Sequence, residues 1–428
     1  MPKPFRLETL PKNPEQQLLL YRAARSIFTK RYGKIEGHLA FAHAKAVTEE
    51  VIRYTARSKD AHWAGMCIVL AILHPLDART VLPPAVLRHL SEADQNAIRR
   101  SFLNLNMLRV QDEAPPDAKE PSIYNVLLKP YQSKAGYVVV PPEVFVRTID
   151  MSEPQFFRGR SAHTLHNMMS HGKFPDVIRN MAHSMLDYWR PAAVQLLLFS
   201  CYDRQSDVIA TYLYPKVFVK MRQLFQSLED EISKLRVNFS KYLSNTMACA
   251  ENRNLPIVTK TNRETGEQVP FILREKTSGS ATIKAVSKGL VSPDGTDFDP
   301  TLILEGIHDV VASTLVAKRC YHAEALYHLI TTKHSHLLVD TEHLFYPQCR
   351  DPEARSCSGY SGVGHLDFRA NLFGADRIRR VELHIRSLDS DREYYHGNAG
   401  RGFRDSAVLA DAWGDLNFKI VQALGNHH

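Results

Sequence analysis

Two segments near residues 365 and 381 alternate apolar and polar side chains without a break. In residues 381–386, an extended strand would bury its apolar side chains and present three polar ones on the other face, namely Glu382, His384 and Arg386. Residues 365–370 alternate in the same way, with polar positions at His365, Asp367 and Arg369. The pattern predicts a hairpin of two polar-faced strands. Side chains on one face follow one another at about 6.6 to 6.8 Å, a spacing that suits groups spread along a polyphosphate. The plain alternative is a strand whose charged face meets only solvent.

The middle of the chain changes to the three- and four-residue repeat of a helix. Pro215 stands where the first turn of a helix tolerates proline, and residues 215–243 carry an apolar stripe with charged and amide side chains on the other faces. The stripe consists of Val217, Met221, Leu224, Leu228, Ile232, Leu235 and Phe239. This predicts an amphipathic helix that packs two halves of the chain. Residues 66–73 form a continuous apolar run and residues 310–316 a largely apolar, strand-like one, which predict a buried helix and a strand.

Candidate phosphate-binding residues precede the second apolar run. On a helix, Ser280, Lys284 and Lys288 fall on one face at i, i+4 and i+8, and Arg274 and Lys276 come just before them. Lysine offers a point charge and arginine a two-pronged donor, so this set can hold phosphates. The plain alternative is a solvated helix face.

Two further features favour a nucleotide site. Asp309 stands at the mouth of the predicted strand, where a carboxylate can hold Mg²⁺ through one oxygen, although an ordinary turn aspartate would look the same. Residues 357–364 are small and flexible and contain Tyr360, as expected where backbone approaches a ligand and an aromatic ring stacks on a base.

Composition narrows the class of protein only slightly. The chain has 428 residues, enough for two or three domains, and a net charge of +8, which fits polyphosphate or RNA partners. No run of eighteen apolar residues and no charged-then-apolar leader is present, so neither membrane insertion nor secretion is expected. Six cysteines without C-x-x-C spacing indicate a reduced, cytoplasmic chain.

Taken in chain order, these segments resemble the synthetase domain of the RelA/SpoT homologue family, whose members transfer pyrophosphate from ATP to the 3′ oxygen of a guanine nucleotide. The family's R-x-K-x-x-x-S-x-x-x-K motif fits residues 274–284 without a gap. Its magnesium-binding aspartate corresponds to Asp309, and its V-E-[IL]-Q-I-R strand resembles residues 381–386. Its G-Y-x-S-x-H element resembles residues 359–365, with one extra residue before His365.

The resemblance implies a role for each of these side chains. Asp309 and Glu382 would bind Mg²⁺, and Glu382 would be the catalytic carboxylate. The ATP phosphates would be held by Arg274, Lys276, Ser280, Lys284, Lys288 and Arg386. The acceptor nucleotide would be contacted by Tyr360, His365 and His384.

The departures from the family pattern lie on the acceptor side. Thr314 stands where the family has arginine, Ser361 where it has a basic residue or glutamine, and His384 where it has glutamine. Residues 292–297 form an insertion before Asp309. The acceptor therefore stays open between a guanine nucleotide, an adenine nucleotide and the 3′ end of tRNA.

The amino-terminal half resembles the family's metal-dependent HD hydrolase domain with its acidic residues lost. Residues 74–80 resemble L-H-D-x-x-E-D-T, with Pro75 in place of the metal-binding aspartate and Ala78 and Arg79 in place of the acidic pair. Residues 161–167 resemble L-A-D-R-L-H-N, with His163 in place of the acid. A transition metal needs several converging histidine and carboxylate ligands. We expect that set to be absent and this half to be inactive as a hydrolase. The alternative is that its histidines regroup into another metal site.

These observations predict an α+β protein with an all-helical pseudo-HD half over residues 1–173 and a helical bridge over residues 174–250. A nucleotidyltransferase-like mixed-sheet synthetase domain is expected over residues 251–428, after a polar link. The modules with which long family members read the ribosome have no room, so ribosome binding is not expected. The expected function is that of a Mg²⁺-dependent pyrophosphokinase with ATP as donor. The rival is a catalytically dead nucleotide sensor that kept the fold.

Overall fold

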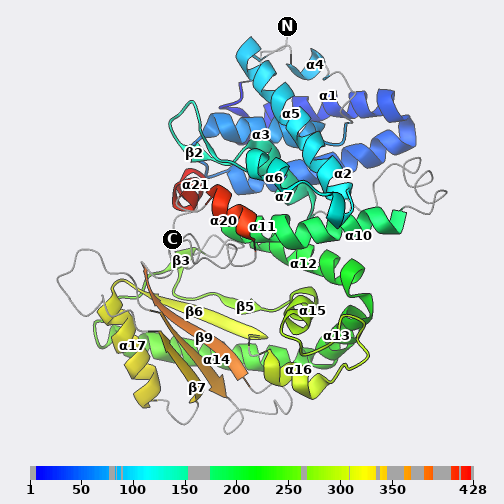
Figure 1. Ribbon diagram of the computed structural model, residues 1–428. Coiled ribbons are helices and arrows are strands. Elements are labelled where there is room, and N and C mark those ends of the chain that lie inside the picture. Colours follow the sequence, from blue (N-terminus) through cyan, green and yellow to red (C-terminus); the bar gives the residue numbers. More distant parts are fainter. Residues whose placement is uncertain are drawn as a thin grey trace. The chain divides into compact units, whose positions relative to one another are not determined.

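The chain forms two compact units in the computed structural model (Figure 1). The helical unit comprises Met1–Tyr212 together with His396–His427, and the sheet unit comprises Leu213–Tyr395. The structure describes residues 6–76, 82, 84–87, 90–152, 174–261, 268–307, 309–333, 338–344, 361–367, 380–388, 406–413 and 416–425. Within these residues the protein is mostly helical with one small mixed sheet, which fits the predicted α+β class.

The helical unit is built almost entirely of helices. Its α-helices are α1 (Pro14–Tyr32), α2 (Lys34–Thr55), α3 (Ala61–Leu73), α4 (Pro84–Leu87), α5 (Glu92–Glu113), α6 (Pro121–Leu127), α7 (Pro142–Asp150), α10 (Phe174–Ser184), α11 (Arg190–Gln195), α12 (Phe199–Leu213), α20 (Ala407–Trp413) and α21 (Asn417–Ala423). A π-helix, Met185–Trp189, joins α10 to α11. Strands β1 (Tyr131–Gln132) and β2 (Val138–Val139) form a short hairpin.

Two of these helices are buried over almost their whole length. The side chains of α3 are buried from Trp63 to Leu73, as its apolar sequence predicted, and Asp60 caps the helix by accepting a hydrogen bond from the Trp63 amide at 2.9 Å. Helix α7 is also buried throughout, yet it carries charged side chains. Both helices pack against each other and against α2. Buried charges need partners, and those of α7 find them in a cluster described below.

The C-terminal helices belong to the helical unit. The Trp413 indole of α20 donates a hydrogen bond to the Leu128 carbonyl at 2.7 Å. Asn417 of α21 donates to the Gln195 side chain at 2.5 Å, and the Lys59 amide donates to the Ala423 carbonyl at 2.9 Å. This division differs from the predicted one, in which residues 251–428 form a single domain. The chain leaves the helical unit near Tyr212 and returns to it after the sheet unit.

The sheet unit begins with two helices and continues with the strands. Its elements are α13 (Pro215–Ser227), α14 (Glu229–Glu251), β3 (Lys260–Thr261), β4 (Gln268–Val269), β5 (Leu273–Glu275), α15 (Ser278–Ser287), α16 (Pro300–Gly306), β6 (Val311–Ala317), α17 (Cys320–Lys333), β7 (Leu338–Leu344), β8 (Ser361–Asp367) and β9 (Arg380–Ser387). The single helix predicted over residues 215–243 is two helices, because Leu228 leaves the helical conformation between them (φ −108°, ψ 2°). The predicted apolar stripe is nevertheless buried on both helices, except that Ile232 is partly buried.

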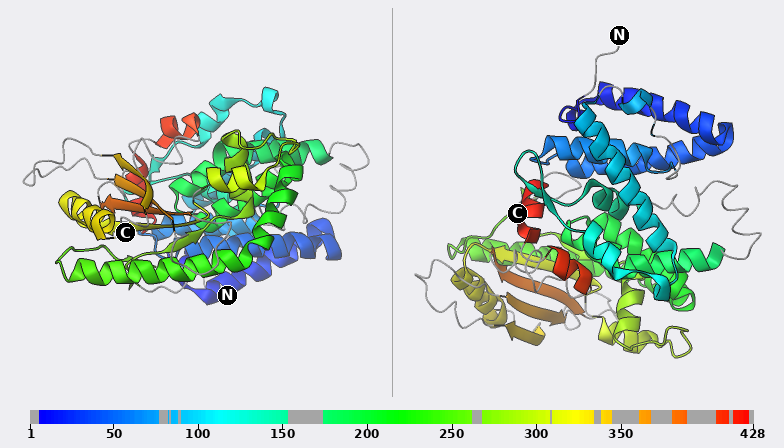
Figure 2. Two further views of the ribbon diagram at one scale, coloured as in Figure 1. Left: turned by 90° about the horizontal axis from the view of Figure 1, so that it is seen from below. Right: turned by 45° about the horizontal axis from the view of Figure 1, so that its top comes forward.

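The five-stranded sheet has the order β5-β6-β9-β8-β7. Strands β6 and β9 run parallel, and the other neighbours are antiparallel. Helices α14 and α17 pack on one face of the sheet (Figure 2), where Val311, Leu315, Val381, Leu383 and Ile385 form the core. The alternation in residues 381–386 therefore buries the apolar side chains of β9, as predicted, and its polar side chains lie on the face of the sheet away from α14 and α17.

The predicted pairing of β8 with β9 is confirmed, but the start of β8 is not where the sequence placed it. Residues 361–364, predicted as part of a flexible loop, lie within the strand. Because β8 has a hydrogen-bonded neighbour on each side, the ladder holds serine and glycine in a conformation that their own propensities do not favour.

Among the described residues, no helix has both the length and the apolar character needed to cross a membrane. The prediction of a fully reduced chain is wrong at Cys320, the first residue of α17, which is disulfide-bonded. Cys67, Cys201 and Cys249 are free thiols.

Candidate functional site

Three cationic side chains of the sheet unit converge on one carboxylate. Asp309 lies just before β6, and its Oδ1 accepts from Lys284 Nζ at 2.7 Å while its Oδ2 lies 2.7 Å from Lys276 Nζ. The Arg274 guanidinium reaches Oδ2 at 3.4 Å. We call these four residues the Asp309 cluster. The predicted phosphate-binding motif thus brings together Arg274, Lys276 and Lys284, and it brings them to the predicted metal ligand.

Local structure explains this convergence. Arg274 lies in β5, which pairs with β6, and the Lys276 amide donates to the Val310 carbonyl at 2.9 Å, next to Asp309. Thr277 then caps α15 by accepting from the Ser280 amide at 3.2 Å. Helix α15 carries Lys284 back toward the strand. The motif is therefore a strand, a cap and a helix that fold around the amino-terminal end of β6.

Opposing effects set the charge of Asp309. Its burial would raise the pKa of the carboxyl, but Lys276 and Lys284 hold that pKa well below its usual value, although the negative charge of Glu382 acts against them. Asp309 is therefore ionised at neutral pH. Glu382 is thus an acidic neighbour whose charge acts on Asp309, and it acts against ionisation.

A row of paired residues crosses the sheet beside the Asp309 cluster. Arg274 of β5 pairs with Ala312 of β6, Ala312 with Glu382 of β9, and Glu382 with His365 of β8. Paired residues point to the same face of a sheet, and strands lie about 4.8 Å apart. Arg274 and Glu382 are thus about 9.6 Å apart across a small alanine.

Along β9 the three polar side chains form a directional chain. Arg386 donates to His384 Nδ1 at 3.1 Å, and His384 Nε2 lies 2.6 Å from Glu382 Oε1. Since Nδ1 accepts, the proton of the neutral imidazole sits on Nε2 and points at Glu382. Burial lowers the pKa of His384, with Arg386 and Arg274 acting in the same direction, while Glu382 opposes them. The predicted set of Glu382, His384 and Arg386 on one face is confirmed.

The remaining predicted residues have mixed outcomes. Ser280 is buried on α15. Lys288 does not join the cluster, because it caps the end of α15 and its Nζ donates to the Gly306 carbonyl at 3.2 Å. His365 holds the register position opposite Glu382. Tyr360 and His163 lie outside the described residues.

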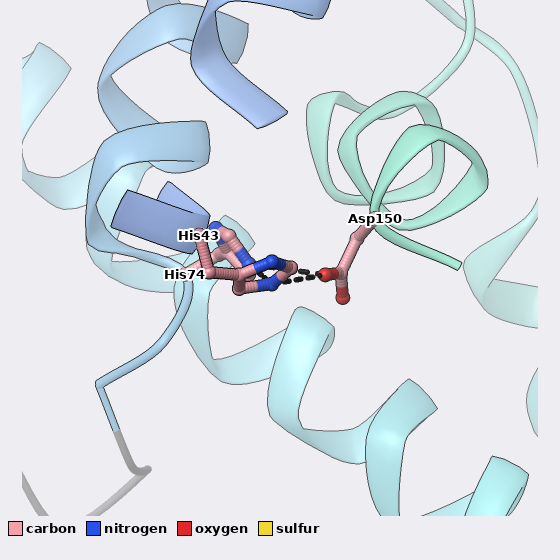
Figure 3. Close-up of side chains that lie close together, drawn as sticks. All are labelled: His43, His74 and Asp150. Atoms are coloured by element: carbon pink, nitrogen blue, oxygen red, sulfur yellow. Dashed lines mark hydrogen bonds and ion pairs between the residues drawn. The ribbon is translucent and has the colours of Figure 1, made fainter. Parts of the chain in front are cut away.

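A second cluster lies in the core of the helical unit. His43 of α2, His74 just after α3, and Asp150 at the end of α7 bring one side-chain atom each to a common point (Figure 3). Asp150 Oδ1 lies 3.0 Å from Nε2 of both histidines, which are themselves 2.9 Å apart. We call these residues the His–His–Asp triad. The prediction that no metal-ligand set converges in this half is wrong for these three residues.

The protonation of the triad leaves lone pairs facing one another. His74 Nδ1 lies 2.5 Å from the Ala71 carbonyl and donates to it, so Nε2 of the same ring has no proton. Burial lowers the pKa of His74 to about 4, even though Asp150 opposes this, so the ring is neutral at pH 7. Burial would raise the pKa of Asp150, but His74, His43 and Arg147 hold it well below its usual value. Two acceptors thus meet at 3.0 Å. A cation between them would remove that repulsion.

The spacing of the triad fits a metal ion. Ligand atoms in neighbouring positions around an octahedral ion with bonds of about 2.0 to 2.1 Å lie about 2.9 Å apart. Two imidazoles and one carboxylate in this facial arrangement suit a divalent transition metal and leave positions for water. A carbonyl that fixes the tautomer of a histidine ligand is typical of such sites.

The sequence did contain a sign of this site. Glu143, Arg147 and Asp150 recur at i, i+4 and i+7 in α7, between apolar residues. An otherwise apolar helix with a charged stripe predicts a buried polar cluster. The ligands themselves come from three separate helices, so no short motif joins them.

We expect acid to destabilise the helical unit through His74. An unfolded histidine takes up a proton near pH 6.5, whereas His74 does so only near pH 4 in the folded chain, so stability falls as the pH drops through that interval. The expected loss is about 3 kcal/mol. Urea unfolding between pH 7 and pH 4, with chelator present, measures it. His74→Gln should show a clearly shallower pH dependence, and an unchanged dependence would contradict the assignment.

Comparison with known proteins adds no assignment. No protein-family model matches the chain, and no curated protein matches it significantly.

Proposed function

We propose that the sheet unit is a Mg²⁺-dependent pyrophosphokinase that transfers pyrophosphate from ATP to the 3′ hydroxyl of a guanine nucleotide. The observation that carries this proposal is the convergence of three cations on Asp309, with Glu382 on the same face of the sheet as Arg274. Glu382 of β9 and Arg274 of β5 both pair with Ala312 of β6, which lies between them. Transfer of phosphoryl-type groups depends mostly on positioning and on neutralisation of charge. A carboxylate pair beside three cations supplies both.

Each side chain has a defined part in this reaction. Arg274, Lys276 and Lys284 hold the phosphates of ATP, which replace Asp309 as their anionic partner. Glu382 takes the proton of the 3′ hydroxyl, and His384 keeps the carboxylate oriented through the 2.6 Å contact. The new bond joins the 3′ oxygen to the β phosphorus. The bond from that phosphorus to the oxygen shared with the α phosphate breaks, and AMP leaves.

The residues present fit Mg²⁺. Asp309 and Glu382 offer only oxygen ligands, which Mg²⁺ prefers, and their mutual repulsion is what a divalent ion would relieve. The bound ion would neutralise charge on the transferred group. Both oxygens of Asp309 contact lysines at 2.7 Å, so binding of the metal and nucleotide goes with a shift of these lysines toward the phosphates.

A direct assay tests this proposal. The full-length protein is incubated with γ-labelled ATP, Mg²⁺ and, in separate reactions, GDP, GTP, ADP, ATP or deacylated tRNA. Label on GDP or GTP is the expected result. Label on an adenine nucleotide or on tRNA would instead name a toxin-like transferase with another acceptor. Nucleotide binding without transfer to any acceptor would favour a catalytically dead sensor.

We further propose that the helical unit binds a divalent transition metal through the His–His–Asp triad without acting as a hydrolase. The mutual spacing of 2.9 to 3.0 Å between the three ligand atoms carries the first part. The second part rests on the sequence, because Pro75 stands where the resembling family has a further metal-binding aspartate.

Metal analysis tests the second proposal. The wild type should retain close to one equivalent of Mn²⁺, Fe²⁺, Co²⁺ or Zn²⁺ after dialysis, and His43→Ala should lose it. The loaded protein should not release phosphate or pyrophosphate from a guanosine 3′-diphosphate. Release that depends on His43 would overturn the assignment as hydrolytically inactive.

A further inference from the structure

A buried chain of polar side chains continues outward from the His–His–Asp triad. Arg147 lies between two carboxylates: its NH1 donates to Asp150 Oδ2 at 2.6 Å, and its Nε donates to Asp112 Oδ2 at 2.8 Å. NH2 lies 2.8 Å from the same Asp112 oxygen. The side chains of Arg147, Asp112 and Asp150 are all 0% exposed. Burying three charged side chains away from solvent costs free energy unless ion pairs and hydrogen bonds compensate them.

Asp112 is itself held in place from its other side. Its Oδ1 accepts from the Tyr124 hydroxyl at 2.8 Å and from the Trp189 indole at 2.9 Å. Trp189 ends the π-helix, a rare element that often marks functional positions, and Tyr124 stacks on Tyr188 with ring centroids 4.0 Å apart. Asp112 thus receives donors from three separate elements, α6, α7 and the π-helix. Asp112 and Arg147 are thus each held by hydrogen bonds on more than one side.

We propose that the Arg147–Asp112 pair is a positioning device for the metal centre of the helical unit. The pair takes Oδ2 of Asp150, so that Oδ1 alone faces His43 and His74 and the carboxylate binds through one oxygen. A ligand whose orientation is fixed in the folded protein loses less freedom when the ion binds. This inference rests on the proposed metal binding by the triad and adds the residues that set its affinity.

Charge and geometry give opposite expectations for Arg147. A guanidinium beside a divalent ion repels it, so if Arg147 acted only through its charge, its removal would tighten metal binding. If Arg147 orients Asp150, its removal weakens binding. Arg147→Lys separates the two effects further, because lysine keeps the charge but has no planar fork with which to bridge two carboxylates.

The experiment is a calorimetric titration of the full-length, metal-stripped protein with Mn²⁺. The binding that His43→Ala abolishes is assigned to the triad. For that binding, Arg147→Lys and Asp112→Asn are each expected to raise the dissociation constant about 10- to 100-fold, as changes to the partners of metal ligands do. Glu143→Gln is the matched control. Glu143 is buried on α7 one turn before Arg147, and its Oε1 accepts a hydrogen bond from Asn104 at 2.7 Å, away from the triad. This variant should bind Mn²⁺ like the wild type.

Unfolding temperatures with and without Mn²⁺ separate positioning from general stability. A residue that only supports the fold would lower both temperatures equally and leave the Mn²⁺-induced increase unchanged. A positioning residue reduces that increase. Equal or tighter binding in Arg147→Lys would overturn the positioning role, because this variant keeps the charge and removes only the fork. If the wild type showed no Mn²⁺ binding that depends on His43, the proposed metal binding by the triad would itself be wrong.

Discussion

Replacing Glu382 with glutamine is expected to lower pyrophosphate transfer by about 10³-fold, in the range typical of a lost general base. Glutamine keeps the size of the side chain and still accepts the hydrogen bond from His384 Nε2, which lies 2.6 Å from Glu382 Oε1 in the wild type. It cannot take a proton or carry negative charge beside Asp309. The change therefore removes chemistry while leaving the strand and its neighbours in place. Initial rates with labelled ATP and the preferred acceptor measure the loss.

Glu275→Gln provides the matched control for this prediction. Glu275 lies in β5 of the same sheet, and its carboxylate makes an exposed ion pair with Arg236 at 2.8 Å. Its position next to Arg274 along the strand directs it to the other face. This variant should transfer pyrophosphate at the wild-type rate. If Glu382→Gln also did so while both variants bound ATP, the polar face of β9 would not be catalytic.

The second large effect is expected from Lys276, whose side chain is 1% exposed and lies 2.7 Å from Asp309. Lys276→Met removes one partner of a buried ion pair and should lower the free energy of unfolding by about 3 kcal/mol. Lys284→Met is the matched comparison, because Lys284 makes a contact of the same length but its side chain is 27% exposed. Its loss should cost about 1 kcal/mol. Urea unfolding of the full-length variants at pH 7 ranks the two.

Acid should reduce the difference between wild type and Lys276→Met. The pKa of Asp309 is held below its unfolded value, so its ion pairs stabilise the fold fully above about pH 4 and lose that effect as the pH falls further. A penalty for Lys276→Met that stayed constant down to pH 2.5 would show that packing, and not the charge of Asp309, accounts for it.

The sheet unit shows how far local sequence patterns reach. Alternation in residues 381–386 predicted the buried and polar faces of β9, since a two-residue repeat has only one reading in a half-buried strand. The sequence also grouped the motif from Arg274 to Lys284 with Asp309, and in the structure Arg274, Lys276 and Lys284 do contact that carboxylate. What the sequence did not predict is that the lysines pair with Asp309 directly, because that depends on where α15 and β6 meet.

The helical unit shows where such patterns fail. His43, His74 and Asp150 are 31 and 76 residues apart along the chain, so their convergence depends on the packing of α2, α3 and α7 and not on any spacing. Motif comparison pointed to residue 75 and to residues 161–167, whereas the carboxylate that reaches the histidines is at the end of α7. Local propensity likewise gave no warning of the break at Leu228, where a continuous apolar stripe passes from one helix to the next.

The return of α20 and α21 to the helical unit has a consequence for synthesis. A ribosome makes proteins from the amino terminus, and domains generally fold as they emerge. Here the partners of Leu128, Gln195 and Lys59 are translated only after the whole sheet unit. The helical unit therefore lacks these contacts until the sheet unit has been translated. A chain that stopped before residue 406 would lack α20 and α21, and the helical unit would then lose its contacts at Leu128, Gln195 and Lys59.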